Sequence, residues 1–152
     1  MADNQQNQPN FVIQKVFTKD ISLESPSAPG IFKDDWSPKP NLNVDTQSHS
    51  IDQNSYRVDL NITLTVKTQE QTAYLIEMTQ SGIFTLENMP EDQIKPLLGA
   101  YCPTTLFPYA KETIDNLINR AGFPPINLAP INFDALYMQN QDQQEQDQPT
   151  KH

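Results

Sequence analysis

The side chains that could carry chemistry in this sequence are one cysteine, two histidines and a few adjacent carboxylates. Cys102 precedes a proline in an apolar stretch, where a thiol is expected to be buried and inert. His49 lies in a polar turn and His152 ends the chain, and neither has a second ligand at metal-binding spacing. The carboxylate pairs at 34–35 and 91–92 fall in loops, with nothing to place them across a cleft. The motifs GxGxxG, GxSxG and HExxH do not occur, so the sequence predicts no metal site, no cofactor and no enzyme.

Charge narrows the class of partner. The 152 residues include 10 basic and 19 acidic side chains, which gives a formal net charge of −9. This balance argues against nucleic acid and anionic membrane surfaces, because both are bound by clustered Lys and Arg. It favours basic partners and high solubility. Apolar residues make up 36% of the chain, below the ~45–50% of an average domain, and the shortfall lies in two polar tails.

Three features bear on the compartment. The single cysteine cannot form an intramolecular disulfide, and no apolar run approaches the ~18 residues of a membrane span. The first ten residues have neither the basic start nor the apolar core of a signal peptide. A reducing cytoplasm is therefore the expected compartment.

The clearest helical pattern runs over residues 104–121. Its apolar residues recur at spacings that put them on one stripe: Phe107, Ala110, Ile114, Leu117, Ile118 and Ala121. Thr104 or Thr105 fits an N-cap, Pro108 fits the first turn, and Gly122 ends the helix. Such a stripe on a helix of about 27 Å needs a large partner surface, from strands or from a second copy of the helix.

Four stretches alternate apolar and polar residues as half-buried strands do: 11–24, 41–48, 56–66 and 72–86. In the first, Phe11, Ile13 and Phe17 are expected on one side, with Asp20 and Glu24 on the other. The polar side of the fourth carries Leu75 and Glu77. Leu75 is either a singly exposed leucine or part of a docking patch shared with Asp20, Glu24 and Glu77.

The order of these elements predicts an α+β domain, with a four-stranded antiparallel sheet. A long helix and a shorter C-terminal helix, beginning at Asn132 or Asp134 and running through Met138, are expected to cover one face. The other face is expected to be polar and wet. Residues 1–10 form a disordered tail, 11–138 the single domain, and 139–152 a polar, Gln-rich tail expected to be frayed or disordered.

Residues 25–40 are rich in proline and predict an ordered crossing loop rather than a strand. The loop carries Ile31, Phe32 and Trp36, which either seal the core or line a groove. An apolar groove bounded by strand edges would accept extended polypeptide, because backbone hydrogen bonds bind a chain without reading its sequence. In the absence of a catalytic constellation, these features favour a binding protein.

Several motifs together resemble the SecB family of bacterial protein-export chaperones. They are FVIQKVFTKDISLE at 11–24, APGIFKDDWSPKP at 28–40, GIF at 82–84, LGAYCPTTLFPYAKETI at 98–114 and FPPINLAPINFDALYM at 123–138. The match runs in register over about residues 11–138, and LGAYCP, LFPYA and NLAPINFDALY are specific in combination.

The resemblance implies a cytoplasmic chaperone that binds unfolded precursor proteins, delivers them to SecA and binds no nucleotide. It implies a homotetramer, a dimer of dimers, with an interface helix carrying Phe107, Ile114, Leu117 and Ile118. The SecA contact carried over from the family falls on Asp20, Glu24, Leu75 and Glu77. The tail of SecA is basic and contains zinc, so that metal belongs to the partner. The client groove carried over from the family falls on Phe17, Phe32, Trp36 and Tyr137.

Two alternatives share this architecture. One is a chaperone of the same fold dedicated to a single client. The other is a carrier of apolar small molecules, with the groove as a closed pocket. An enzyme that uses Cys102 or paired carboxylates has no supporting constellation.

Overall fold

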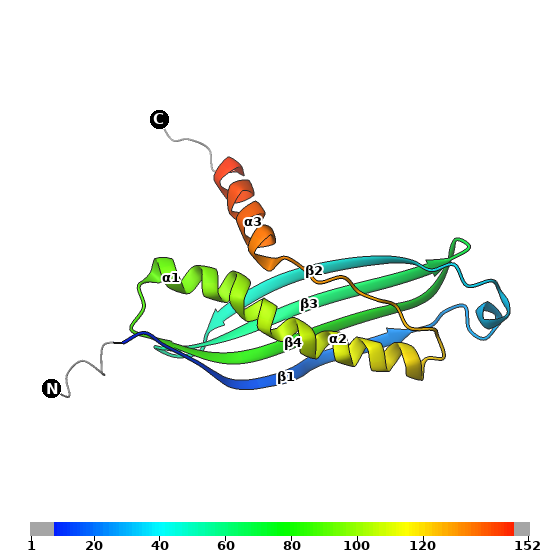
Figure 1. The fold of residues 1–152 in the computed structure, drawn as a ribbon, viewed down its shortest axis with the longest axis horizontal. Helices are drawn as coiled ribbons and strands as arrows, with labels where there is room; N and C mark the ends of the chain where they lie inside the picture. Colours follow the sequence, from blue (N-terminus) through cyan, green and yellow to red (C-terminus); the bar gives the residue numbers. More distant parts are fainter. Residues whose placement is uncertain (1–7, 148–152) are drawn as a thin grey trace.

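The computed structural model describes residues 8–147, which form an antiparallel sheet with helices on one face (Figure 1). The strands are β1 (Asn10–Glu24), β2 (Lys39–Ser50), β3 (Ser55–Thr68) and β4 (Gln71–Glu87), in the spatial order β1-β4-β3-β2. The predicted α+β class and the four strands are therefore confirmed. Residues 1–7 of the predicted N-terminal tail lie outside the described residues, and Asn10 already belongs to β1.

The long helix starts earlier than its apolar pattern suggested. α1 (Glu91–Pro96), the π-helical segment η2 (Leu97–Tyr101) and α2 (Cys102–Arg120) follow one another without a break. The predicted N-cap is wrong, because Thr104 and Thr105 lie inside the helix and donate hydrogen bonds to carbonyls one turn back. Pro108 also lies inside α2 rather than in its first turn. The helix ends before Gly122, whose φ of +91° favours glycine.

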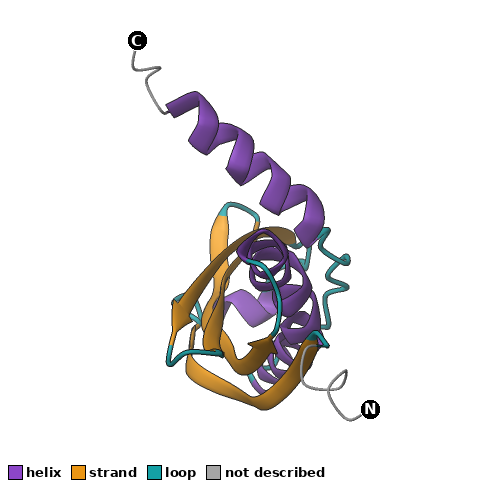
Figure 2. Ribbon diagram, turned by 90° about the vertical axis from the view of Figure 1, so that its left-hand side faces the viewer, coloured by secondary structure: helices purple, strands orange, loops and turns teal. Residues whose placement is uncertain are grey.

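The core lies between α2 and the two central strands, β3 and β4. Along both strands, alternate side chains face the helix and are almost completely buried, among them Leu60, Ile62, Tyr74, Ile76 and Met78. The helix contributes the predicted stripe together with Leu106. Because the sheet twists around α2 (Figure 2), one helix covers most of the apolar face. We call the other face of the sheet, which α2 does not cover, the open face.

Strand β1 carries two extra residues relative to β4. The register passes from Ile13 opposite Phe84 to Lys15 opposite Ile83, and again skips one residue between Thr18 and Asp20. Each extra residue is a bulge that reverses the alternation of side chains. Phe17 therefore lies on the open face opposite Ser81. The prediction that Phe17 shares a side with Phe11 and Ile13 is wrong for this reason.

The C-terminal helix α3 (Phe133–Asp147) begins on the body and then points away from it (Figures 1 and 2). Asn132 caps it, since its side-chain Oδ1 accepts a hydrogen bond from the Ala135 N–H at 3.0 Å. Its first turns pack on the core of the body through Phe133, Leu136 and Tyr137. The helix continues past Met138, so the expectation of a frayed or disordered tail is wrong for residues 139–147. Residues 148–152, including His152, lie outside the described part of the chain.

Candidate functional site

The open face brings the four predicted docking residues together. Glu24 lies directly opposite Leu75, Asp20 lies opposite Thr79, and Glu77 occupies the position between Leu75 and Thr79 on the same face of β4. Paired residues of antiparallel strands point to the same side, so the four side chains share one surface. We call this surface the acidic patch: Asp20, Glu24, Leu75 and Glu77.

The acidic patch is accessible to a partner, and its carboxylates form no ion pairs or hydrogen bonds within residues 8–147. Asp20, Glu24 and Glu77 are exposed, and Leu75 is half-buried. Within residues 8–147, none of the three carboxylates takes part in an ion pair or hydrogen bond. Three unpaired negative charges around one accessible leucine can hold a basic segment that also carries an apolar side chain.

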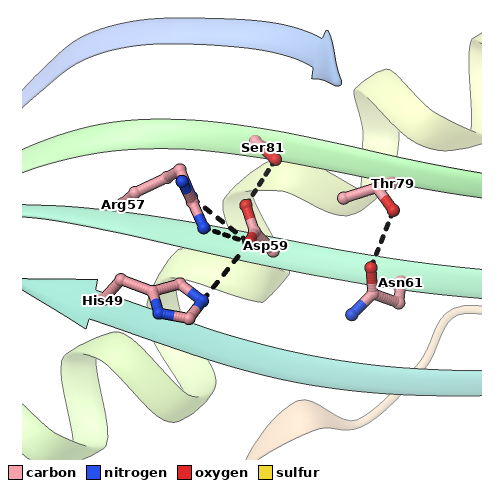
Figure 3. Close-up of polar contacts among 6 residues, drawn as sticks. All are labelled: His49, Arg57, Asp59, Asn61, Thr79 and Ser81. Atoms are coloured by element: carbon pink, nitrogen blue, oxygen red, sulfur yellow. Dashed lines mark hydrogen bonds and ion pairs between the residues drawn. The ribbon is translucent and has the colours of Figure 1, made fainter. Parts of the chain in front are cut away.

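Beside the acidic patch, the open face contains a buried carboxylate, Asp59 on β3 (Figure 3). Ser81 Oγ donates a hydrogen bond to it at 2.6 Å, and Arg57 Nε donates another at 3.2 Å. His49 Nε2 lies 3.6 Å from the same carboxylate. Asp59 is only 4% exposed, a depth that a carboxylate tolerates when it is paired and hydrogen-bonded.

These residues include the side chains of a hydrolase triad, but in the wrong order. In a triad the imidazole lies between the hydroxyl and the carboxylate, so that it can take the hydroxyl proton. In this cluster the carboxylate of Asp59 lies between Ser81 and His49. Ser81 is also fully buried, out of reach of a substrate. The cluster therefore has the geometry of a structural network.

The aromatic residues of the crossing loop gather at the C-terminal end of α2. Ring centroids of Phe32 and Trp36 lie 5.0 Å and 5.6 Å from that of Phe123, and the ring centroid of Tyr74 lies 4.9 Å from it. Phe123 is 5% exposed whereas Phe32 is 50% exposed. The loop thus seals the end of the core through Ile31 and Trp36 and leaves the Phe32 ring exposed, and its role in lining a groove stays a prediction.

Tyr137 lies in a separate place, where α3 leaves the body. Three adjoining hollows of about 750, 390 and 150 Å³ meet at its side chain, between α1, α3 and the edge strand β2. Gly99 of η2 makes the position of the ring possible, because a Cβ there would overlap it. Polar side chains of β2 and α3 line the hollows beside the ring, among them Thr46, Asn140 and Gln141.

The predicted client-groove residues consequently do not form one cavity. Phe17 lies on the open face, Phe32 and Trp36 lie beyond the end of α2, and Tyr137 lies beside its start. The length of the helix alone separates the last two places by about 28 Å.

The predicted interface residues of α2 are already used within the chain. Phe107, Ile114 and Ile118 are buried in the core, and Leu117 is half-buried against it. Exposed apolar side chains lie elsewhere, on the edge strand β1 and on another side of the helical stretch: Ile13, Ile21, Tyr101 and Tyr109, which are 37–53% exposed. Sequence reasoning missed the two tyrosines because they fall outside the apolar stripe.

Cys102 is fully buried, and burial raises the pKa of its thiol to about 12. This agrees with the prediction of an inert thiol. Across residues 8–147, His, Cys, Asp and Glu side chains do not gather in threes to hold a metal ion. In the same part of the chain, no helix has the length and apolar character needed to cross a membrane.

The sequence of this chain matches a known protein family. The model of the family described as preprotein translocase subunit SecB matches residues 4–144. The chain is 49% identical over 148 residues to protein-export protein SecB of Methylococcus capsulatus, covering 97% of this chain and 96% of that protein. It is 51% identical over 136 residues to protein-export protein SecB 1 of Francisella tularensis, covering 90% of this chain and 92% of that protein.

A solved structure has the same fold. It is a SecB-like chaperone of Mycobacterium tuberculosis in complex with an antitoxin peptide, and it aligns with a TM-score of 0.67 at 16% identity. The alignment covers 80% of this chain and 90% of that one.

Proposed function

Since this chain belongs to the SecB family and is an export chaperone of the Sec pathway, we propose a specific role for it. In this proposal it holds precursor proteins unfolded in the cytoplasm and delivers them to SecA. Identity of about 50% to export proteins over nearly the whole chain favours this function over a chaperone with one dedicated client. The carrier alternative is not favoured either, because the hollows around Tyr137 are lined by exposed residues such as Met138.

The acidic patch is the observation that carries the proposal for SecA. Its carboxylates are exposed and unpaired within the described residues, and the register holds them on one face. The partner segment we propose is the basic, zinc-containing tail of SecA, with an apolar side chain against Leu75. In this proposal the zinc belongs to SecA.

The test is binding of purified SecA to Asp20→Ala and Glu77→Ala variants, measured by calorimetry. Each change should weaken binding about fivefold, since an exposed ion pair contributes up to ~1 kcal/mol. Binding by the unchanged chain should weaken as salt rises, because exposed charges are screened. Glu112→Ala, an exposed carboxylate on α2, is the matched control and should bind SecA as the unchanged chain does. Docking that ignores both salt and the patch substitutions would refute the assignment.

For the client we propose the hollows around Tyr137 and the neighbouring edge of β2. An edge strand presents unpaired backbone N–H and C=O groups, which can pair with an extended chain of any sequence. Tyr137 supplies apolar contact beside that edge, and Met138 lines the adjoining hollow between α1 and α3. Phe32 and Trp36 offer a second apolar surface for the same client, whereas Phe17 lies on the docking side of the sheet.

Tyr137→Ala should weaken the holding of an unfolded precursor while leaving SecA binding unchanged. The measurement is the yield of complex on a native gel, at several precursor concentrations. Equal yields for the variant and the unchanged chain would place the client elsewhere.

We also propose the homotetramer, assembled through the surface that Ile13, Ile21, Tyr101 and Tyr109 leave exposed. An exposed apolar surface next to an unpaired edge strand is suited to a second copy, because a two-fold contact uses the same patch on both subunits. Tyr109→Asp should lower the mass measured by light scattering. A tetrameric mass for that variant would refute this choice of surface, and a monomeric mass for the unchanged chain would refute the tetramer.

A further inference from the structure

Gln80 on β4 is a polar side chain on the apolar, helix-side face of the sheet. It is 3% exposed, lies opposite Leu60 of β3, and follows Met78 on the same face. An amide buried in such surroundings is unfavourable unless its polar atoms are hydrogen-bonded. The position of Gln80 therefore needs partners that justify it.

Both partners of Gln80 lie on β1 at the second bulge. Its Nε2 donates a hydrogen bond to the backbone carbonyl of Phe17 at 3.1 Å. Its Oε1 accepts a hydrogen bond from Thr18 Oγ1 at 3.2 Å. The extra residue of the bulge, Lys19, is the next residue along the chain. Gln80 thus binds the last two residues of β1 that pair with β4 before the ladder is interrupted at Lys19.

This bulge decides which side chain stands beside Glu77. With it, Phe17 and Asp20 both lie on the open face, although they are three residues apart. In a regular strand, the next residue on the open face after Phe17 would be the one two positions later, which is Lys19. Without the bulge, every later residue of β1 would change sides, so the open face would receive Lys19 and lose the carboxylates of Asp20 and Glu24.

We propose that Gln80 is a positioning residue for partner docking: its side-chain amide holds the bulge that places Asp20 in the acidic patch. The role in docking rests on the proposed function of that patch. The role in holding the bulge rests on the hydrogen bonds and register alone, and the two parts are tested by different readouts.

The first readout is amide hydrogen exchange over residues 16–22 in the full chain. Gln80→Met removes both hydrogen bonds with little change of shape, so the amides of β1 around the bulge should exchange at least tenfold faster. Gln14→Met is the matched control, because Gln14 lies at the first bulge and its Nε2 donates a hydrogen bond to Thr85 Oγ1. It should leave exchange at residues 16–22 unchanged. Equal protection in the Gln80→Met variant and the unchanged chain would overturn the proposal, whatever SecA does.

The second readout is a pair of double-mutant cycles with purified SecA. Gln80→Met alone should weaken binding about fivefold, the same factor expected for Asp20→Ala. If Gln80 acts by placing Asp20, combining these two changes should weaken binding by less than the product of the two separate factors. Combining Gln80→Met with Glu77→Ala should instead be additive, about 25-fold in total. Additivity with Asp20→Ala would overturn the positioning role.

A separate variant guards against loss of folding. Thr18 is exposed, so Thr18→Val removes one bond to Gln80 without disturbing the core, and it should produce the same two effects at smaller size. The inference would be contradicted if Thr18→Val showed the hydrogen exchange and SecA binding of the unchanged chain, and if the Gln80→Met protein folded and also showed both unchanged. Failure of Asp20→Ala to alter SecA binding would refute the proposed docking patch, and the exchange measurement would still decide whether Gln80 holds the bulge.

Discussion

Asp59→Val should destabilise the fold markedly, although the residue lies on the face without helices. Valine keeps the volume and suits a strand, so packing is little changed. What disappears is the acceptor for Ser81 Oγ and for Arg57 Nε. The Arg57 side chain is 34% exposed and can return to water, whereas Ser81 is fully buried and cannot.

The magnitude follows from those two partners. Hydrogen bonds to a charged group contribute about 1.5–3 kcal/mol, and a buried hydroxyl left without an acceptor costs about 1–3 kcal/mol. Relief from burying the carboxylate offsets part of this, which leaves a loss of about 3 kcal/mol. For a chain of this length, that loss lowers Tm by roughly 6–12 °C. The double variant Asp59→Val/Ser81→Ala removes the orphaned hydroxyl as well and should recover about half of the loss.

The assay is thermal unfolding followed by circular dichroism, at one fixed protein concentration because assembly also shifts Tm. Asn61→Val is the matched control on the same strand and face. Its Oδ1 accepts a hydrogen bond from Thr79 Oγ1 at 2.8 Å, but both residues are half-buried, so it should cost less than ~1.5 kcal/mol. A single variant as stable as that control, or a double variant no better than the single one, would refute the reasoning.

Three further predictions concern the thiol, the crossing loop and the Tyr137 hollows. Burial raises the Cys102 pKa to about 12, so folding opposes ionisation of the thiol, and the free energy of unfolding should fall by up to ~1.4 kcal/mol per pH unit above about pH 9. Cys102→Ala should remove this pH dependence, measured by denaturant unfolding between about pH 8 and pH 10.5. Trp36 is the one tryptophan of the chain, so a tryptophan-free unfolded client should change its emission, and an unchanged spectrum would assign the residue to the core alone. Gly99→Ala should displace the Tyr137 ring and weaken client holding, whereas Gly30→Ala, which has open space around it, should have no effect in the same native-gel assay.

The sequence could predict the core because periodicity records burial directly. Four residues of the predicted stripe are buried on α2, namely Phe107, Ala110, Ile114 and Ile118, and Leu117 and Ala121 pack against the core half-buried. Strands β3 and β4 alternate as their residues do. The grouping of Asp20, Glu24, Leu75 and Glu77 on one face also agrees with the register. Alternation within each strand places Asp20 with Glu24 and Leu75 with Glu77, and the antiparallel pairing of β1 and β4 in the structure brings the two pairs together.

The bulges in β1 could not be read from alternation, because one extra residue changes the parity of every residue after it. The adjacent apolar pair Val16–Phe17 was the available signal, since a regular half-buried strand would bury only one of them. Asp59 was equally hidden, because its burial depends on Ser81 of a neighbouring strand and thus on the register between strands. The C-terminal helix was predicted, but its continuation over residues 139–147 was missed because the Gln-rich composition of that segment favoured disorder. Glutamine is a good helix former even where it buries nothing.

On the proposed assignments, the sheet separates two tasks. Leu75 and Glu77 face outward from β4, while Ile76 and Met78 between and beside them are buried against α2. Substitution of Leu75 or Glu77 should therefore affect docking of the partner, whereas substitution of Ile76 or Met78 should affect the stability of the fold. The client hollows lie on the helix side of the sheet, between β2 and the helices α1 and α3. The acidic patch lies on the open face of β1 and β4, with β3 between it and β2. Since neither proposed surface covers the other, we propose that SecA docks while the precursor is still held, so that transfer does not require the client to leave first.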